Sequence, residues 1–457
     1  VRAYQAARRA LERLPLVNAS ARGVAWVYIG GSLYASAGLQ TALDALTAAR
    51  AEDRARRTAV ASRGLTAECF IYWMAADALS LKETAEELLL LARQNHWRES
   101  GAWALYFHGN ALYAMNDLSG AADDYTEVLN QRHSAPGFAF VHSAFGLASV
   151  LEDQGDMQAA LAVVQMVRNY GRQIGNEPIQ HTIAAFEAYL AAKQGRLDEA
   201  YAWAVGANRV VQSLPMPHFF APGVAIAAIL VQVGTPACLA EAEQMLGHLE
   251  QLLVAAHNRR FLIDVLVLKA IVWNTRQRQT EAVAVLTEAV GLAQPGDMIR
   301  PFLDAGTALD ALLPHLRPDA SQADFVAWIR SERSLACTAQ KQVLGQAVVQ
   351  TPIQASAGAA VQVPVQVPVQ ATVPLETVVQ PQHPDLIELL TLRELQVLRL
   401  LAVRLTNKEI AHALGISVGT VKQHTRSVFS KLHADNRRDA IVQARNMGFQ
   451  FDSPHSF

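Results

Sequence analysis

Cationic and amide side chains gather in one short stretch near the C-terminal end of the chain, at Lys422, Gln423, Arg426 and Lys431. Lysine and arginine donate hydrogen bonds to guanine edges, and glutamine can pair with adenine. Residues 385–457 hold ten Lys or Arg against seven Asp or Glu, whereas the whole chain holds 39 against 41, so the positive charge is local. The net charge of −2 excludes a protein that is basic throughout and holds nucleic acid by charge alone. These residue types favour recognition of DNA over catalysis.

Four helices are expected to position these side chains, and the first two begin with capping boxes. Thr391 can cap a helix whose Glu394 returns a hydrogen bond to the backbone, and Thr406 and Glu409 repeat the arrangement. The residues expected to face inward are Leu395, Leu398 and Leu401 with the small Ala402 on the first helix, and Ile410, Ala411 and Leu414 on the second.

A sharp turn separates the second helix from the third. Gly415 can take the left-handed conformation that the turn requires, Ile416 fills the core, and Ser417 caps the third helix. Asn436 or Asp435 then begins a fourth helix. The inward-facing residues are Val421, Val428 and Leu432 on the third helix and Ala440, Ile441, Ala444 and Met447 on the fourth, which Gly448 ends.

The motifs of this segment closely resemble those of the LuxR-type helix-turn-helix. That family has leucine, threonine, any residue, arginine and glutamate, then asparagine-lysine-glutamate-isoleucine-alanine, then threonine-valine-lysine, any residue and histidine. Arg404 departs from the pattern, because the family commonly has a helix-ending glycine there. The matching residues here are Leu390 to Glu394, Asn407 to Ala411 and Thr420 to His424.

The resemblance implies that the third helix enters the major groove of double-stranded DNA. It implies base reading by Lys422, Gln423 and Arg426, and contacts to phosphates from Thr420, Lys408 and Lys431. Each basic residue could instead be an ordinary solvated surface charge. Ser417 and His424 complete the candidate set, although His424 is more often structural in such helices. Such modules usually act as dimers on inverted repeats, which makes the fourth helix around Ile441 and Arg445 the expected homodimer surface.

Upstream of this segment, a helical repeat runs through most of the chain. A small-residue turn, a hydrophobic residue and then an alanine recur about every 40 residues, which is typical of one helical hairpin per repeat. The alanine lets two helices approach closely. The recurring alanines are Ala42, Ala85, Ala121, Ala160, Ala200, Ala242 and Ala282.

The pattern resembles tetratricopeptide repeats, somewhat lengthened, over roughly residues 35–293. The alternative is a helical bundle without repeats. A stack of such hairpins has a concave face suited to a ligand or protein partner. Most of the aromatic residues are expected in the core of the stack and not in a ligand site, namely Trp73, Trp103, Tyr106, Trp203 and Trp273.

A second signature, Gly296 to Gly306, follows the last repeat. It predicts a turn, a short hydrophobic segment with a basic residue, and a new helix, and nothing in its spacing demands chemistry. Arg300 and Asp304 are four residues apart and can pair with each other. The signature resembles the segment that closes the repeat region in the maltose-regulator-like branch of LuxR-type activators, whose members usually carry an ATP-binding module upstream. The expectation here is that this ATP-binding module is lost or lies before Val1.

Between the two parts, residues 346–384 change character. This stretch has no Lys or Arg and repeats Val-Pro-Val-Gln, so it predicts an extended or disordered tether. Prolines 364, 368 and 374 argue against β-strands, since they would interrupt a ladder. The predicted organisation is a repeat domain at 1–345, a linker at 346–384 and a DNA-binding domain at 385–457.

The remaining features predict a cytoplasmic protein. Cys69, Cys238 and Cys337 match no metal spacing and are expected to be core thiols in a reducing compartment. The longest apolar runs, 138–151 and 221–233, fall short of the ~20 residues that cross a bilayer. No signal peptide is expected, and no cofactor or metal.

The sequence therefore predicts an all-α chain, a tetratricopeptide-like solenoid followed by a four-helix helix-turn-helix domain. Its expected function is sequence-specific DNA-binding transcriptional regulation, as an activator, with RNA polymerase and an unidentified inducer as further partners. A helical-repeat scaffold with a vestigial DNA-binding tail is the alternative. An enzyme is disfavoured because Gly30-Gly31-Ser32 lacks the lysine of a phosphate-binding loop, and a phosphorylated response regulator because the receiver pattern is missing.

Overall fold

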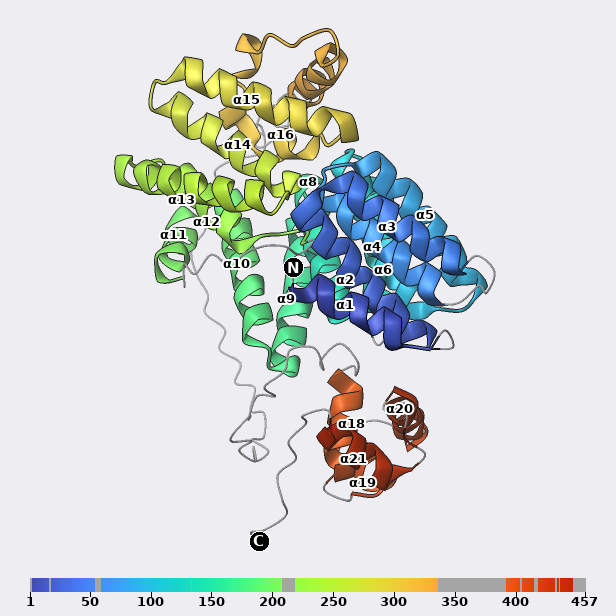
Figure 1. Cartoon of the computed structure of the whole chain (residues 1–457). Coiled ribbons are helices and arrows are strands. Elements are labelled where there is room, and N and C mark those ends of the chain that lie inside the picture. The colour runs from blue at the N-terminus through green and yellow to red at the C-terminus, as the bar shows by residue number, and fades with distance from the viewer. Residues whose placement is uncertain are drawn as a thin grey trace, which may run out of the picture. The chain divides into compact units, whose positions relative to one another are not determined.

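The computed structural model describes residues 2–15, 18–53, 59–132, 134–207, 218–335, 392–402, 405–414, 418–431, 434 and 436–446. The chain divides into two compact units, Val1–Thr351 and Pro352–Phe457. The regular structure in these described ranges is entirely helical (Figure 1). The predicted all-α class is thereby confirmed, whereas the predicted linker at 346–384 lies outside the described residues.

Helix pairs make up the first unit. The helices are α1 (Arg2–Arg13), α2 (Ala19–Ala37), α3 (Leu39–Asp53), α4 (Ala59–Met74), α5 (Ala78–Gln94), α6 (Arg98–Ala114), α7 (Leu118–Asn130), α8 (Gly137–Asp153), α9 (Met157–Ile174), α10 (Glu177–Lys193), α11 (Leu197–Gly206), α12 (Pro222–Val233), α13 (Pro236–Ala255), α14 (Arg259–Thr275) and α15 (Gln279–Ala293). Short elements follow: η1 (Gln294–Gly296), α16 (Arg300–Asp304), η2 (Gly306–Leu309), η3 (Leu313–His315) and a helical stretch at 323–335.

The alanines that marked the repeat all lie on the second helix of their pair. Each is the fourth residue of its helix in α3, α7, α9, α11 and α15, and lies further along the helix in α5 and α13. Every one of the seven has an exposed fraction of 0%, so no larger side chain would fit without moving a neighbouring helix. The predicted repeat is confirmed, and the alanine is its packing residue.

Eight turns in the described ranges share one backbone conformation. A residue with positive φ is followed by an N–H that donates to the carbonyl five residues earlier, as when Asp77 donates to Tyr72 at 3.0 Å. Glycine adopts this conformation freely, whereas other residues do so at a cost. Only two of these eight turns use glycine. The turn residues are Ala76, His96, Asn116, Gly155, Gly195, His257, Gln277 and Asp297.

An extended segment, 218–221, crosses the first helices of four successive pairs. Trp73 of α4 donates through Nε1 to the His218 carbonyl at 2.8 Å. Phe219 lies 5.0 Å from the Tyr113 ring of α6, and Phe220 contacts aromatic rings of α8 and α10. Along this segment the inner face of the repeats is therefore filled by the chain itself.

Most other sequence expectations for this unit concern buried side chains. Trp73 and Tyr106 are core residues, while Trp103, Trp203 and Trp273 are half-buried and pack against the core. Cys69 and Cys238 are buried free thiols, and Cys337 lies outside the described residues.

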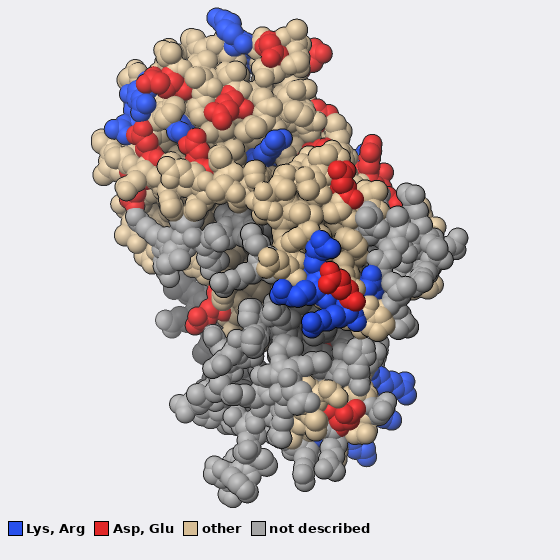
Figure 2. Space-filling view, viewed as in Figure 1, with Lys and Arg blue, Asp and Glu red and all other residues tan. Residues whose placement is uncertain are grey.

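Acidic and basic side chains are interspersed over the upper repeats (Figure 2). None of the helices in the described ranges is long and apolar enough to cross a membrane.

The second unit contains four short helices, α18 (Leu392–Ala402), α19 (Asn407–Leu414), α20 (Val418–Lys431) and α21 (Arg437–Asn446). Its buried core joins the first three helices through Val397, Leu401, Ile410, Ala411 and Val421. The predicted stripe of α18 is incomplete. Val397 is fully buried, one turn before Leu401, although the prediction passed over it in favour of Leu395, whose side chain lies outside the described residues.

Candidate nucleic-acid interface

Helix α20 presents two cationic side chains on one outward face. Val421 and Val428 are completely buried and fix the helix against the core. Lys422 and Arg426 are exposed and lie one helical turn apart, on the side away from those valines. A rigid helix with donors at this spacing can place both side chains against neighbouring base pairs.

Helix α19 begins with the predicted capping box. The Thr406 backbone N–H donates to Glu409 Oε2 at 2.7 Å, and the Thr406 hydroxyl donates to the same oxygen at 2.8 Å. In return the Glu409 N–H donates to Thr406 Oγ1 at 3.4 Å. These hydrogen bonds from Thr406 lower the pKa of the Glu409 carboxyl. The box fixes the first turn of α19, where Lys408 is exposed.

Replacing Thr406 with alanine is expected to destabilise the second unit by about 1 kcal/mol, because it removes the hydroxyl that donates to the Glu409 carboxylate and accepts from the Glu409 N–H. Urea unfolding followed by circular dichroism measures the change. Thr406→Ser keeps the hydroxyl and serves as the matched control. Equal losses in the two variants would contradict a capping role.

Glu394 joins α18 to α20. Its side chain is buried, with an exposed fraction of 4%, and Oε1 accepts a hydrogen bond from the Ser427 hydroxyl. The predicted capping box pairs Glu394 with Thr391, which lies outside the described residues. The contact with Ser427 was not predicted. It fixes the angle between the first helix and the helix that carries Lys422 and Arg426.

Arg437 joins the start of α21 to the end of α18. Its guanidinium donates to the Leu401 carbonyl at 2.7 and 3.1 Å and to the Leu405 carbonyl at 2.8 Å. A cation at a helix C-terminus satisfies carbonyls that have no partner within the helix. The sequence did contain a signal, since Arg437 lies three residues before the buried Ala440 and therefore on the inward face of α21.

The structure places the predicted DNA-binding residues unevenly. Lys422 and Arg426 are exposed together on α20, Lys408 is exposed on α19, and Thr420 and His424 are half-buried on α20. Gln423 and Lys431 belong to α20, but their side chains lie outside the described residues, as do Ser417 and Gly415. Helix α20 begins at Val418, directly after Ser417.

The fourth helix is capped as expected. The Asp439 N–H donates to Asn436 Oδ1 at 3.0 Å, so Asn436 is the cap. The alternative cap, Asp435, lies outside the described residues. On α21 Ile441 is half-buried and Val442 is 47% exposed. An apolar side chain is thus available on the outer face of this helix.

Two family models match the chain. One, described as the MalT-like TPR region, matches residues 1–319, and the other, described as bacterial regulatory proteins of the luxR family, matches residues 388–444. The first covers the repeats and the second covers the four short helices.

Individual relatives match shorter stretches. The HTH-type transcriptional regulator MalT of Vibrio campbellii is 27% identical over 212 residues, which are 45% of this chain and 21% of that protein. The response regulator protein VraR of Staphylococcus saprophyticus is 41% identical over 63 residues, 14% of this chain and 30% of that protein. The matches thus span about a fifth to a third of these relatives.

Among solved structures, yeast Tom70 is similar with a TM-score of 0.38 and 13% sequence identity, covering 71% of this chain and 61% of that one. A likeness at that score carries no weight for function. The family matches and the helix geometry together describe a repeat body joined to a helix-turn-helix.

Proposed function

Because the chain belongs to the family with a MalT-like tetratricopeptide region, and carries a C-terminal helix-turn-helix of the luxR family, we propose that it is a sequence-specific transcriptional activator controlled by a ligand or protein that its repeats sense. The observation that carries the proposal is the exposed pair of Lys422 and Arg426 on a helix held by Val421, Val428 and the Glu394–Ser427 contact. Relatives named as regulators support it.

Base recognition falls to α20. Arg426 and Lys422 donate to guanine edges in the major groove, and Gln423 pairs with adenine. Lys408 at the start of α19 and Lys431 at the end of α20 hold phosphates, with Thr420, Ser417 and His424 completing the contact surface. Helix α21, with Val442 exposed, forms the homodimer contact on an inverted repeat.

Replacing Arg426 with alanine is expected to weaken binding to the cognate site by about 1 to 3 kcal/mol, roughly 5- to 150-fold, and to relax its specificity. The reason is loss of a base contact, since Arg426 is exposed and the fold does not depend on it. Gel-shift titration at fixed salt, with sites selected from genome-wide mapping of bound DNA, measures the effect.

Lys408→Ala is the matched control for that experiment. Because Lys408 is proposed to contact a phosphate, its loss should lower affinity for all DNA sequences alike and should reduce the salt dependence of binding by about one counterion. Unchanged affinity of the Arg426 variant for specific DNA would overturn its assignment. Failure of the wild-type chain to bind any DNA would instead favour the scaffold function.

The repeats supply the control. The inducer binds within the first unit, in the cytoplasm, and the regulator then recruits RNA polymerase. The chain itself is not expected to hydrolyse ATP, and sustained turnover by the purified protein would contradict that expectation.

A further inference from the structure

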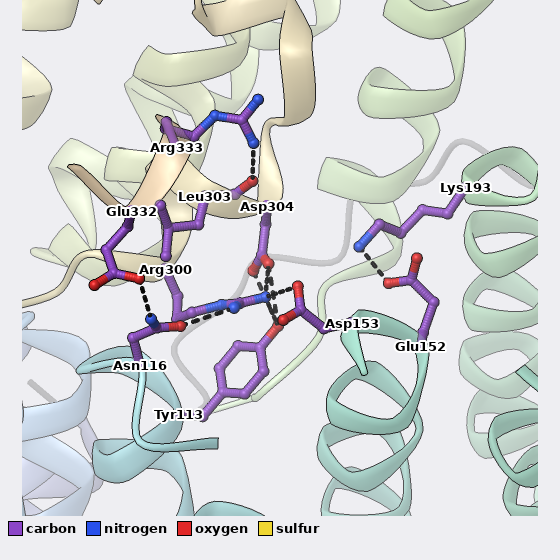
Figure 3. Close-up of polar contacts among 10 residues, drawn as sticks. All are labelled: Tyr113, Asn116, Glu152, Asp153, Lys193, Arg300, Leu303, Asp304, Glu332 and Arg333. Carbon is purple, nitrogen blue, oxygen red and sulfur yellow. Dashed lines mark hydrogen bonds and ion pairs between the residues drawn. The ribbon is translucent and has the colours of Figure 1, made fainter. Parts of the chain in front are cut away.

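The signature Gly296 to Gly306 connects two parts of the first unit that are far apart in sequence. Element η1 contacts α5, and α16 contacts both α6 and α14. Figure 3 shows the Arg300 and Asp304 side chains of α16 pointing toward Tyr113, Asn116 and Asp153. The end of the repeat stack is therefore joined back to its earlier helices.

Arg300 is the centre of this connection. Its side chain is 2% exposed, yet its guanidinium reaches Asn116 Oδ1 at 3.0 Å, Asp153 Oδ1 at 3.1 Å and Asp304. The guanidinium carbon lies 4.8 Å from the centre of the Tyr113 ring, and the Tyr113 hydroxyl donates to Asp304 Oδ2 at 3.0 Å. The pairing of Arg300 with Asp304 was predicted, but the partners on α6 and α8 were not.

We use "clasp" for these groups, which are Arg300 and Asp304 on α16 together with Tyr113, Asn116 and Asp153. Electrostatics favour its closed form. Burial alone would raise the pKa of Asp304, but attraction to Arg300 and Lys193 and hydrogen bonds from Tyr113 and Arg300 hold it below its usual value. The closed clasp therefore keeps Asp304 ionised beside two cations.

The two sides of α16 differ in character. Ile299 and Phe302 are completely buried, and Phe302 meets Phe325 edge-on at 6.1 Å within the segment that follows the repeats. The apolar side of α16 thus packs against the segment that follows the repeats, whereas its polar side forms the clasp. Opening the clasp would leave the apolar contact between Phe302 and Phe325 in place.

Two other contacts between early and late parts of the unit are polar, beside an apolar core that extends from Leu65 to Ile329. The Tyr34 hydroxyl donates to the His257 carbonyl at 2.6 Å, and Asn116 Nδ2 donates to Glu332 Oε2 at 3.2 Å. Polar seams of this kind give weak net stability, because desolvation offsets much of the Coulomb attraction, although removing one partner is costly. Arg300 Nε even lacks a hydrogen-bond partner among the described residues. Such a seam suits a contact that opens and closes.

We propose that the clasp is a conformational switch: it closes the repeat stack on itself, opens as a unit without unfolding of the helix pairs, and so sets the two states between which the sensed ligand or partner selects. Only the last step, selection between the two states by a ligand or partner, rests on the proposed sensory function. Opening itself is a property of the chain alone, so the two can fail separately.

Hydrogen–deuterium exchange of the full-length protein, without DNA or inducer, tests the opening. In the wild type, amides of 112–117, 150–156 and 296–305 should exchange together and faster than those in the middle of α8 and α14. Arg300→Met should raise exchange in these three segments by roughly 100-fold, as loss of one partner of a buried pair implies, with helix content unchanged.

Arg333→Met is the matched control. Arg333 is also buried and ion-paired, but its partners Asp310 and Leu303 lie on the same side of the clasp. This variant should leave exchange at 112–117 and 150–156 unchanged. Equal effects of the two variants, or protection of the three segments up to the global unfolding free energy, would overturn the switch.

A milder substitution tests the clasp even if the Arg300 variant does not fold. Tyr113→Phe keeps the ring under Arg300 and removes only the hydroxyl, which donates to Asp304 and accepts from Arg300. It should raise exchange in the same segments by several-fold, and no change would count against the clasp. Gel shifts on the same samples report DNA binding: clasp opening without any DNA binding would leave the switch standing and sink the proposed function.

Discussion

Replacing Gly296 with alanine is expected to destabilise the first unit by about 3 kcal/mol, the upper end of overpacking penalties. A Cβ at this position would lie 2.1 Å from the Ala76 carbonyl oxygen and 2.8 Å from Asp77 Cα. Both atoms are backbone. They cannot give way easily, because Ala76 holds the left-handed turn and Asp77 caps α5 through Ser80 N–H at 3.0 Å.

Thermal and urea unfolding of the full chain measure this loss. The control is Gly247→Ala in α13, where an added Cβ meets nothing within 4 Å. That change should stabilise the protein by up to about 1 kcal/mol, since alanine favours a helix interior over glycine. If both alanine variants behaved alike, the contact between η1 and the α4–α5 turn would have no energetic weight.

Replacing Ile410 with alanine is expected to abolish DNA binding without touching a DNA contact. Ile410 of α19 is completely buried in the core that α19 shares with α18 and α20. Truncation of a buried isoleucine to alanine costs about 2 to 5 kcal/mol of stability. A domain of this size has about that much stability in total. The second unit should therefore unfold, while the transition of the repeats keeps its midpoint.

Calorimetry and gel shifts together check this outcome. The control is His412→Ala, at an exposed position on α19 outside the proposed DNA and dimer contacts, which should change stability by less than about 0.5 kcal/mol and leave DNA binding unchanged. Retained DNA binding by the Ile410 variant at wild-type affinity would show that the core of this unit does not hold α20 in place.

Local patterns in the sequence predicted most of the fold. The alanine spacing identified the helix pairs, and the Thr406–Glu409 and Asn436 caps were read correctly because capping depends on residues only three positions apart. The resemblances to the LuxR-type helix-turn-helix and to the maltose-regulator-like branch are likewise confirmed. The base-reading roles of Lys422, Gln423 and Arg426 remain predictions.

Contacts between distant positions were beyond such patterns. Arg300 meets Asp153 and Asn116 across 147 and 184 residues, and Trp73 meets His218 across 145. Neither helical periodicity nor capping indicates which turns of the repeat stack lie side by side in the folded chain. The filling of the inner face by residues 218–221 went unpredicted for the same reason.

The eight turns that share this conformation also bear on how such a protein can evolve. Each is closed by main-chain hydrogen bonds, and the left-handed position accepts alanine, histidine, asparagine, glutamine or aspartate as well as glycine. The turn therefore does not depend on which side chain occupies that position. Mutation can thus change the side chain at these turns without loss of the main-chain hydrogen bonds, as at Asn116, whose side-chain oxygen accepts a hydrogen bond from Arg300.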